Sequence, residues 1–273
     1  MKIVVFDLDE TLGYFVLFGV FWDCLIRFLI EYDNSNEELT QSEFNNILDL
    51  YPEFLRPNII NILTYLKHKK KSNCCHGMMI YTNNQAPKIW ANYIISYFES
   101  KINFKLFDQI ISAFKINGKQ LEFCRTTHDK TYNDLVKCTK IPKHSEICFL
   151  DDSYYPEMTN DKVFYINIKP YIHDLKFDTI LHRFMNSSHY NKLIKKKSEF
   201  KKHMNNYFKE YNFFIQEKND AENNIDTLLS KQIMTHLQEF FNKSSRNKVR
   251  KTEMNNKTRK HKVNKKSKTH KNY

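Results

Sequence analysis

The chain has 273 residues, of which 41% are hydrophobic and 15% aromatic, a composition that supports a sizeable core and predicts roughly two domains. The formal net charge of +12 lies at the end of the chain, because residues 242–273 contain thirteen Lys or Arg and one acid, whereas residues 1–241 contain 30 of each sign. The apolar run from Thr11 to Trp22 is shorter than the roughly 20 residues that span a bilayer, and Asp7 and Asp9 interrupt the N-terminal apolar run. We therefore expect no signal peptide and no contact with a membrane.

The cysteines show no paired framework and no CxxC motif. Adjacent Cys74 and Cys75 lack a second cluster that would complete a tetrahedral metal site. We expect reduced thiols and a cytoplasmic or nuclear, reducing compartment. The six residues are Cys24, Cys74, Cys75, Cys124, Cys138 and Cys148.

The first predicted element is a strand from Ile3 to Phe6, a β-branched and aromatic run typical of a strand buried on both faces. Ligands of open α/β sheets bind beyond the carboxyl ends of the strands, where Asp7 and Asp9 lie. Alternation across Leu8 points both carboxylates the same way. Their repulsion predicts a hard divalent cation, Mg²⁺, although a solvated acidic turn would explain this stretch equally well.

Residues 13–55 read as a small cap inserted after the first strand. Strand and helix patterns then alternate, which predicts an α/β fold with a Rossmann-like parallel sheet and helices on both faces. The expected elements are a helix opened by Arg56-Pro57 and ending near 71, a strand at 78–81, a helix at 87–98, a strand at 107–113, a turn at Asn117-Gly118, a helix at 130–139, and strands at 146–150 and 163–168.

The pattern changes after Tyr171. Residues 190–214 and 225–241 carry apolar side chains at helical spacing among many lysines, which predicts two amphipathic helices. Residues 242–273 are almost free of apolar side chains and are expected to be disordered. This tail either binds nucleic acid or another acidic partner, serves as a nuclear address, or only solubilises the chain. The expected organisation is a domain at 1–185, including the cap, a helical extension at 186–241 and the basic tail.

Polar residues end three strands of the predicted sheet, and a lysine opens the helix before the last of them. Phosphoryl transfer needs such a set: a carboxylate to attack phosphorus, a hydroxyl and an ammonium to hold its oxygens, a metal, and an acid for the leaving oxygen. The residues are Asp7, Asp9, Thr82, Lys130, Asp151 and Asp152. Taken singly, Thr82 reads as a helix cap and Lys130 as a solvated lysine, and Arg125 and His128 are expected at the surface.

In order along the chain, these stretches resemble the four motifs of the haloacid dehalogenase superfamily. The resemblance covers residues 1–185, and within the superfamily it is nearest to the phosphatases of the RNA polymerase II C-terminal domain and the NLI-interacting-factor-like group. The matching stretches are Phe6-Asp7-Leu8-Asp9-Glu10-Thr11-Leu12, Tyr81-Thr82, Lys130 and Phe149-Leu150-Asp151-Asp152, supported by Arg56-Pro57 and Ser153.

The resemblance implies an aspartyl-phosphate on Asp7, with Asp9 protonating the leaving alcohol and later activating water. Thr82, Asn83 and Lys130 would bind the substrate phosphate. The resemblance also implies Mg²⁺ held by the Asp7 side chain, the Asp9 main-chain carbonyl and an acid of the fourth motif.

The fourth motif leaves the metal-binding acid open. The family's usual Asp-Asn-Ser-Pro puts Asp152 at the metal and Asp151 beside Lys130. Here Asp152 replaces the Asn and Tyr154 replaces the Pro, so the division between the two aspartates stays open.

The expected function is a Mg²⁺-dependent phosphatase of phosphoserine or phosphothreonine in protein. Two alternatives stay open: a phosphatase of small metabolites or nucleic-acid ends with the same fold, and a non-catalytic binding module that acts through the basic tail.

Overall fold

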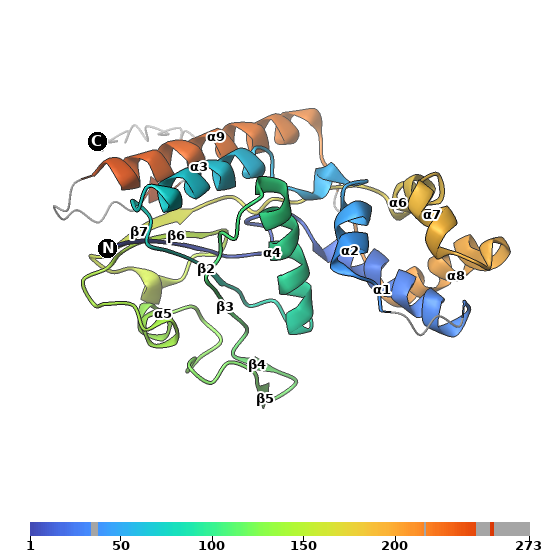
Figure 1. The fold of residues 1–273 in the computed structure, drawn as a ribbon, viewed down its shortest axis with the longest axis horizontal. Helices are drawn as coiled ribbons and strands as arrows, with labels where there is room; N and C mark the ends of the chain where they lie inside the picture. The colour runs from blue at the N-terminus through green and yellow to red at the C-terminus, as the bar shows by residue number, and fades with distance from the viewer. Residues whose placement is uncertain (34–37, 216, 244–251, 254–273) are drawn as a thin grey trace, which may run out of the picture.

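A parallel sheet forms the centre of the computed structural model, which describes residues 1–33, 38–215, 217–243 and 252–253 (Figure 1). The strand order is β3-β2-β1-β6-β7-β8, and each of these neighbouring pairs is parallel. The strands are β1 (Lys2–Phe6), β2 (Gly77–Tyr81), β3 (Gln109–Ile111), β6 (Glu146–Asp151), β7 (Val163–Asn167) and the short β8 (Thr252–Glu253). The predicted α/β fold with a Rossmann-like sheet is confirmed.

Each face of the sheet has its own core. Val4 and Phe6 of β1 belong to one buried cluster, together with side chains of α3 (Ile59–Lys71), α4 (Lys88–Ile102) and α9 (Asp220–Asn242). Ile3 and Val5 point the other way, into a smaller cluster with α5 (Tyr132–Thr139). Because side chains alternate along a strand, a strand covered on both faces needs an uninterrupted apolar run. This run is the pattern from which β1 was predicted.

Five helices form a lobe beside one end of the sheet, to the right in Figure 1. This helical lobe consists of α1 (Val16–Glu31), α2 (Gln41–Leu48), α6 (Phe177–Met185), α7 (Ser188–Leu193) and α8 (Lys197–Glu210). Aromatic rings join its distant parts: Phe28 of α1 lies 4.9 Å from Phe200 of α8, and Phe21 lies 5.5 Å from Phe184 of α6. The cap segment and the first part of the predicted extension therefore pack together, whereas α9 lies beside α3 on the sheet.

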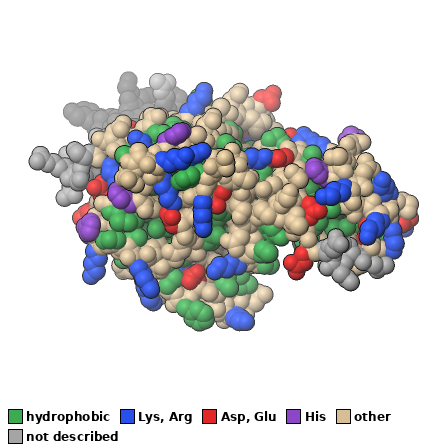
Figure 2. All heavy atoms as spheres, viewed as in Figure 1, with side chains coloured by type: hydrophobic (Ala, Val, Ile, Leu, Met, Phe, Trp, Pro, Cys, Tyr) green, Lys and Arg blue, Asp and Glu red, His purple; other side chains and the backbone are tan. Residues whose placement is uncertain are grey.

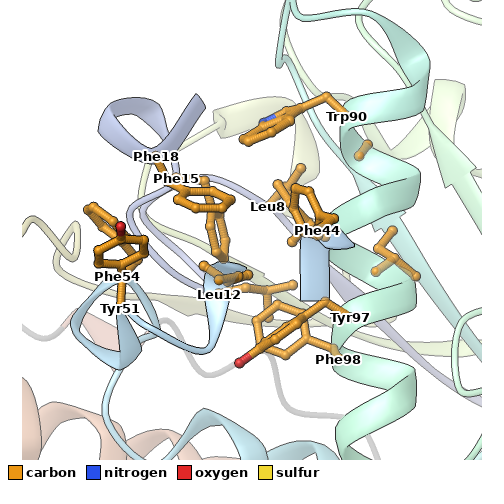
Figure 3. Close-up of a cluster of buried hydrophobic side chains, with 14 of the residues drawn as sticks. Leu8, Leu12, Phe15, Phe18, Phe44, Tyr51, Phe54, Trp90, Tyr97 and Phe98 are labelled. Carbon is orange, nitrogen blue, oxygen red and sulfur yellow. The ribbon is translucent and has the colours of Figure 1, made fainter. Parts of the chain in front are cut away.

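Aromatic packing also anchors the helical lobe to the sheet domain. Figure 3 shows rings from α1, α2 and α4 gathered near Leu8 and Leu12, which follow β1. Phe18 of α1 lies 5.5 Å from Phe44 of α2 and 6.0 Å from Trp90 of α4, measured between ring centroids. Aromatic contacts of this kind bury large apolar areas and fix the orientation of the rings. The helical lobe thus packs directly against the residues that follow β1.

The smaller elements complete the chain. Strands β4 (Lys115–Ile116) and β5 (Lys119–Gln120) form an antiparallel hairpin, and 3₁₀ turns occur at η1 (Pro52–Phe54) and η2 (Pro156–Met158). Asn117 and Gly118 have φ angles of 49° and 78°, the left-handed conformation that a tight hairpin turn requires. The turn predicted there is confirmed.

The expectation of six reduced thiols is wrong for one pair. Cys124 and Cys138 form a disulfide with a Cα–Cα distance of 5.0 Å, while Cys24, Cys74, Cys75 and Cys148 are free. The two partners are 14 residues apart in the chain, and α5 packs against the segment that carries Cys124, which brings them together. No sequence motif marks this pairing.

The basic tail lies mostly outside the described residues. The predictions that it is disordered and that it binds nucleic acid therefore concern residues 244–251 and 254–273, which the structure does not describe. Thr252 and Glu253 form β8 and pair with β7. At these two residues the structure differs from the expectation that the whole tail is disordered. Among the helices in the described ranges, none has the length and apolar character needed to cross a membrane. Basic and acidic side chains are interspersed on the face in Figure 2, in keeping with the balanced charge of residues 1–241.

Candidate active site

Apart from Lys130, the predicted site residues lie at or just beyond the carboxyl ends of three adjacent strands of the sheet. Phe6 of β1 pairs with Ile80 of β2 and with Leu150 of β6. One residue further on, Asp7 lies level with Asp151, and the Asp7 amide donates to the Leu150 carbonyl at 2.9 Å. The register of the parallel sheet therefore delivers the first and fourth motifs to the same place.

Lys130 joins these two motifs. Its side chain is buried, and Nζ donates hydrogen bonds to Asp7 Oδ1 and, at 2.7 Å, to Asp151 Oδ2. Burial alone would lower the pKa of Lys130, but the charges of Asp7 and Asp151 outweigh it and raise the pKa above its ordinary value. Lys130 is thus a fixed ammonium between two carboxylates, not the solvated lysine that the residue alone suggested.

Three carboxylates gather around this ammonium. One oxygen from each of Asp7, Asp151 and Asp152 lies within 4.8 Å of the others. Thr11 Oγ1 donates to Asp152 Oδ1 at 3.1 Å, and the Ser153 amide donates to Asp151 Oδ1 at 2.9 Å. Asp152 accepts its hydrogen bond from Thr11, whereas Asp151 accepts one from Lys130. The two aspartates therefore have different surroundings, and which of them would bind a metal stays a prediction.

The charges in this cluster fit a divalent cation. Burial raises the pKa of Asp151 to about 7, with Lys130 lowering it and Asp7 raising it, and burial followed by Asp7 also raises the pKa of Asp152. When ionised, three carboxylates and one ammonium leave two negative charges. Mg²⁺ would neutralise both, and carboxylate oxygens are the ligands it prefers. The donor set therefore fits Mg²⁺.

Asp9 lies two residues beyond Asp7 and has a different environment. Its Oδ2 accepts a hydrogen bond from Asn84 Nδ2 at 2.6 Å, whereas Oδ1 is buried without a hydrogen-bond partner among the described residues. Burial raises the pKa of Asp9 to about 7, the Asn84 hydrogen bond lowers it, and the charge of Asp7 raises it. A carboxyl group with a pKa near neutrality can give and take a proton under physiological conditions.

The second motif is tied to the others through its neighbours. Thr82 is buried, and its Oγ1 accepts from the Asn84 amide at 2.9 Å, which leaves its hydroxyl proton free to donate. Thr82 does not cap α4, because that helix begins after Pro87. Asn83 donates to the Tyr155 hydroxyl at 3.1 Å, so its predicted role in binding phosphate stays a prediction.

The expectation that Arg125 lies at the surface is wrong, whereas His128 is exposed as expected. The Arg125 side chain is 1% exposed, and its guanidinium donates to the carbonyls of Thr82 at 3.1 Å, Ser112 at 2.9 Å and His128 at 2.8 Å. Five fixed donors allow one arginine to join several main-chain segments. Arg125 therefore ties the end of β2 to the loop that carries Lys130.

Arg56 has the same role on the other side of the site. It is buried, and its guanidinium donates to the carbonyls of Thr11 at 2.6 Å and Lys169 at 2.9 Å, and also to that of Glu10. These bonds hold the turn after Asp9, where Glu10 has a φ of 57°. In the sequence, Arg56 only supported the family resemblance, and its role in holding this turn was not predicted.

Sequence reasoning missed two polar contacts of the site. Thr11 lies inside the first motif and could have been identified as a partner for the fourth. Asn84 carried no signal, because a polar residue three positions after a strand end is common in any loop.

Comparison of the chain with protein-family models, with curated proteins and with solved structures finds no match.

Proposed function

We propose that the protein is a Mg²⁺-dependent phosphatase that hydrolyses phosphate monoesters through an aspartyl-phosphate on Asp7. The observation that carries this proposal is the contact of buried Lys130 with both Asp7 and Asp151, with Asp152 beside them. An ammonium and a cluster of carboxylates on a rigid sheet edge provide the preorganised charge that phosphoryl transfer requires.

In the first step an oxygen of Asp7 attacks phosphorus, and the bond to the alcohol oxygen breaks with its electron pair. Asp9 gives its proton to that oxygen, which suits a carboxyl group whose pKa is about 7. In the second step water attacks phosphorus, Asp9 takes its proton, and the bond to Asp7 breaks to release phosphate. Lys130 and Thr82 would hold the non-bridging oxygens.

Asp7 and Asp152 would hold Mg²⁺, with Asp151 as the alternative ligand and the Asp9 carbonyl as the main-chain ligand that the resemblance implies. When bound, Mg²⁺ would supply positive charge that offsets the negative charge on the phosphoryl oxygens.

The test is hydrolysis of p-nitrophenyl phosphate with Mg²⁺ and with a chelator. We expect activity that Mg²⁺ restores after chelation and that Asp7→Asn abolishes without unfolding the protein. Asp161→Asn, which changes an exposed carboxylate, is the matched control and should keep full activity. Equal rates for wild type and Asp7→Asn would refute the proposal.

The physiological substrate stays a prediction from the sequence. A side-by-side assay of phosphoserine and phosphothreonine peptides, sugar phosphates and end-phosphorylated oligonucleotides tests it. Deleting residues 242–273 separates the enzyme from the binding-module alternative, because a catalyst keeps its turnover of a small substrate.

The cytoplasmic or nuclear compartment also stays a prediction. The Cys124–Cys138 disulfide removes part of its basis, because disulfides are rare in reducing compartments.

A further inference from the structure

An apolar groove adjoins the candidate active site. It has a volume of about 880 Å³, and Asp9 and Asn84 lie among the residues that line it. One wall is α1, and the other is the start of α4 together with the β2–α4 loop. Because Asp9 is the proposed acid for the leaving oxygen, the groove is continuous with the place where a leaving group would sit.

Several apolar side chains that are exposed to solvent line this groove. Val16, Ile30 and Ile89 line it with exposed fractions of 45%, 59% and 54%. Val16, Val20 and Ile30 recur on one face of α1 at helical spacing, opposite Ile89 on α4. Single exposed apolar residues are ordinary, but a contiguous set that lines a concave surface marks a binding site.

The charged residues of the groove all have the same sign. They are Asp9, Asp23 and Glu38, and no Lys, Arg or His of the described residues lines it. Like charges repel across a contact surface, so the groove disfavours an anionic occupant beyond the reacting phosphate itself. An uncharged or cationic apolar group fits this lining.

We propose that this groove binds the leaving group of the substrate, and that this group is a bulky apolar alcohol without negative charge. The inference rests on the proposed phosphatase function and specifies its substrate class. The volume lies within the range of roughly 300–1,000 Å³ that is typical of small-molecule pockets. The size therefore favours a discrete organic group, such as an aryl or alkyl chain, over a long stretch of polymer.

The proposal predicts a dependence of rate on chain length. n-Alkyl phosphates from methyl to octyl have leaving groups of nearly equal basicity, so their kcat/KM values compare binding in the groove. We expect kcat/KM to rise about fourfold per added methylene, since each buried methylene is worth roughly 0.8 kcal/mol. An ω-amino alkyl phosphate should be a better substrate than the ω-carboxy compound of equal length.

Two substitutions on opposite walls test the location. Val16→Glu and Ile89→Glu each place an acid in the first turn of a helix, where the helix dipole favours it and folding should be retained. We expect kcat/KM for octyl phosphate to fall about tenfold, the equivalent of roughly two buried methylenes, and the fall for methyl phosphate to be much smaller. Leu228→Glu is the matched control, because Leu228 is 58% exposed on α9 and lies outside the groove.

Intrinsic fluorescence gives a readout that does not depend on turnover. The two tryptophans of the chain, Trp22 and Trp90, both line the groove. Titration with n-alkylphosphonates, which have no hydrolysable ester bond, should change the tryptophan emission. The dissociation constant from these titrations should fall as the alkyl chain becomes longer. Chain-length-dependent binding without hydrolysis of any ester would support the groove and refute the phosphatase.

Three results would overturn the groove assignment and leave the phosphatase standing. The first is equal kcat/KM for methyl and octyl phosphate, and the second is a preference for the ω-carboxy compound. The third is faster hydrolysis of a phosphoserine peptide than of octyl phosphate, which would point to a peptide as the occupant.

Discussion

Replacing Lys130 by Met should destabilise the protein strongly and in a pH-dependent way. Lys130 is 1% exposed and pairs with Asp7 and, at 2.7 Å, with Asp151. Methionine fills a similar volume, so the variant mainly removes the charge. Removing one partner of a buried pair leaves an uncompensated charge, which costs about 3–5 kcal/mol. We expect the free energy of unfolding near pH 8 to fall by that amount.

The loss should shrink as the pH falls. Burial already raises the pKa of Asp151 from 3.8 to about 7, and without Lys130, which lowers it, the pKa of Asp151 rises further. A carboxyl group whose pKa is raised by folding adds stability when protonated and loses it as pH rises through the folded value. The variant should therefore recover stability relative to wild type as the pH falls toward about 7, because below that pH Asp151 is protonated in both folded proteins.

Urea denaturation of the metal-free protein at several pH values measures this effect. Lys101→Met is the matched control: Lys101 pairs with Asp49 at 2.6 Å, but both side chains are more than a third exposed. Exposed pairs contribute about 1 kcal/mol or less. A loss for Lys130→Met no larger than for Lys101→Met, or one that is constant with pH, would refute the reasoning about this buried ion pair.

Three further predictions concern neighbouring groups. In the metal-free protein Asp9→Asn should raise the free energy of unfolding at pH 8 by up to about 4 kcal/mol and change it little at pH 4, because burial raises the pKa of Asp9 from 3.8 to about 7; urea denaturation would show it. Arg125→Met should lower the free energy of unfolding by about 3 kcal/mol, because several buried carbonyls lose their donor, and equal stability in thermal melts would contradict this. Thiol titration of the unfolded, unreduced protein should find four thiols, and six would mean that Cys124 and Cys138 are not bonded.

The strands that build the candidate site were predictable because their signal is local. β1, β2 and β6 are short apolar runs that each end in polar residues, and parallel strands place such ends at one sheet edge. The contact between Lys130 and Asp7 could be expected from the resemblance, but its geometry comes from register and from the capping of α5 by Thr131.

Contacts between distant segments were not predictable in the same way. The amphipathic pattern of residues 190–214 predicts that one helix face is buried but does not identify the element that covers it. In the structure, α8 from this stretch packs against α1. Arg125 was misjudged because charged side chains are usually exposed, and only the fold supplies the carbonyls that surround it. The Cys124–Cys138 pair likewise depends on how α5 packs.

The packing of α1 against α6 and α8 has a consequence for biosynthesis. During translation α1 emerges early, yet Phe184 and Phe200, the partners of Phe21 and Phe28, emerge more than 160 residues later. Until then the aromatic side of α1 lacks these neighbours. A nascent chain can therefore form most of the sheet and its acidic edge before α1 gains its contacts with α6 and α8.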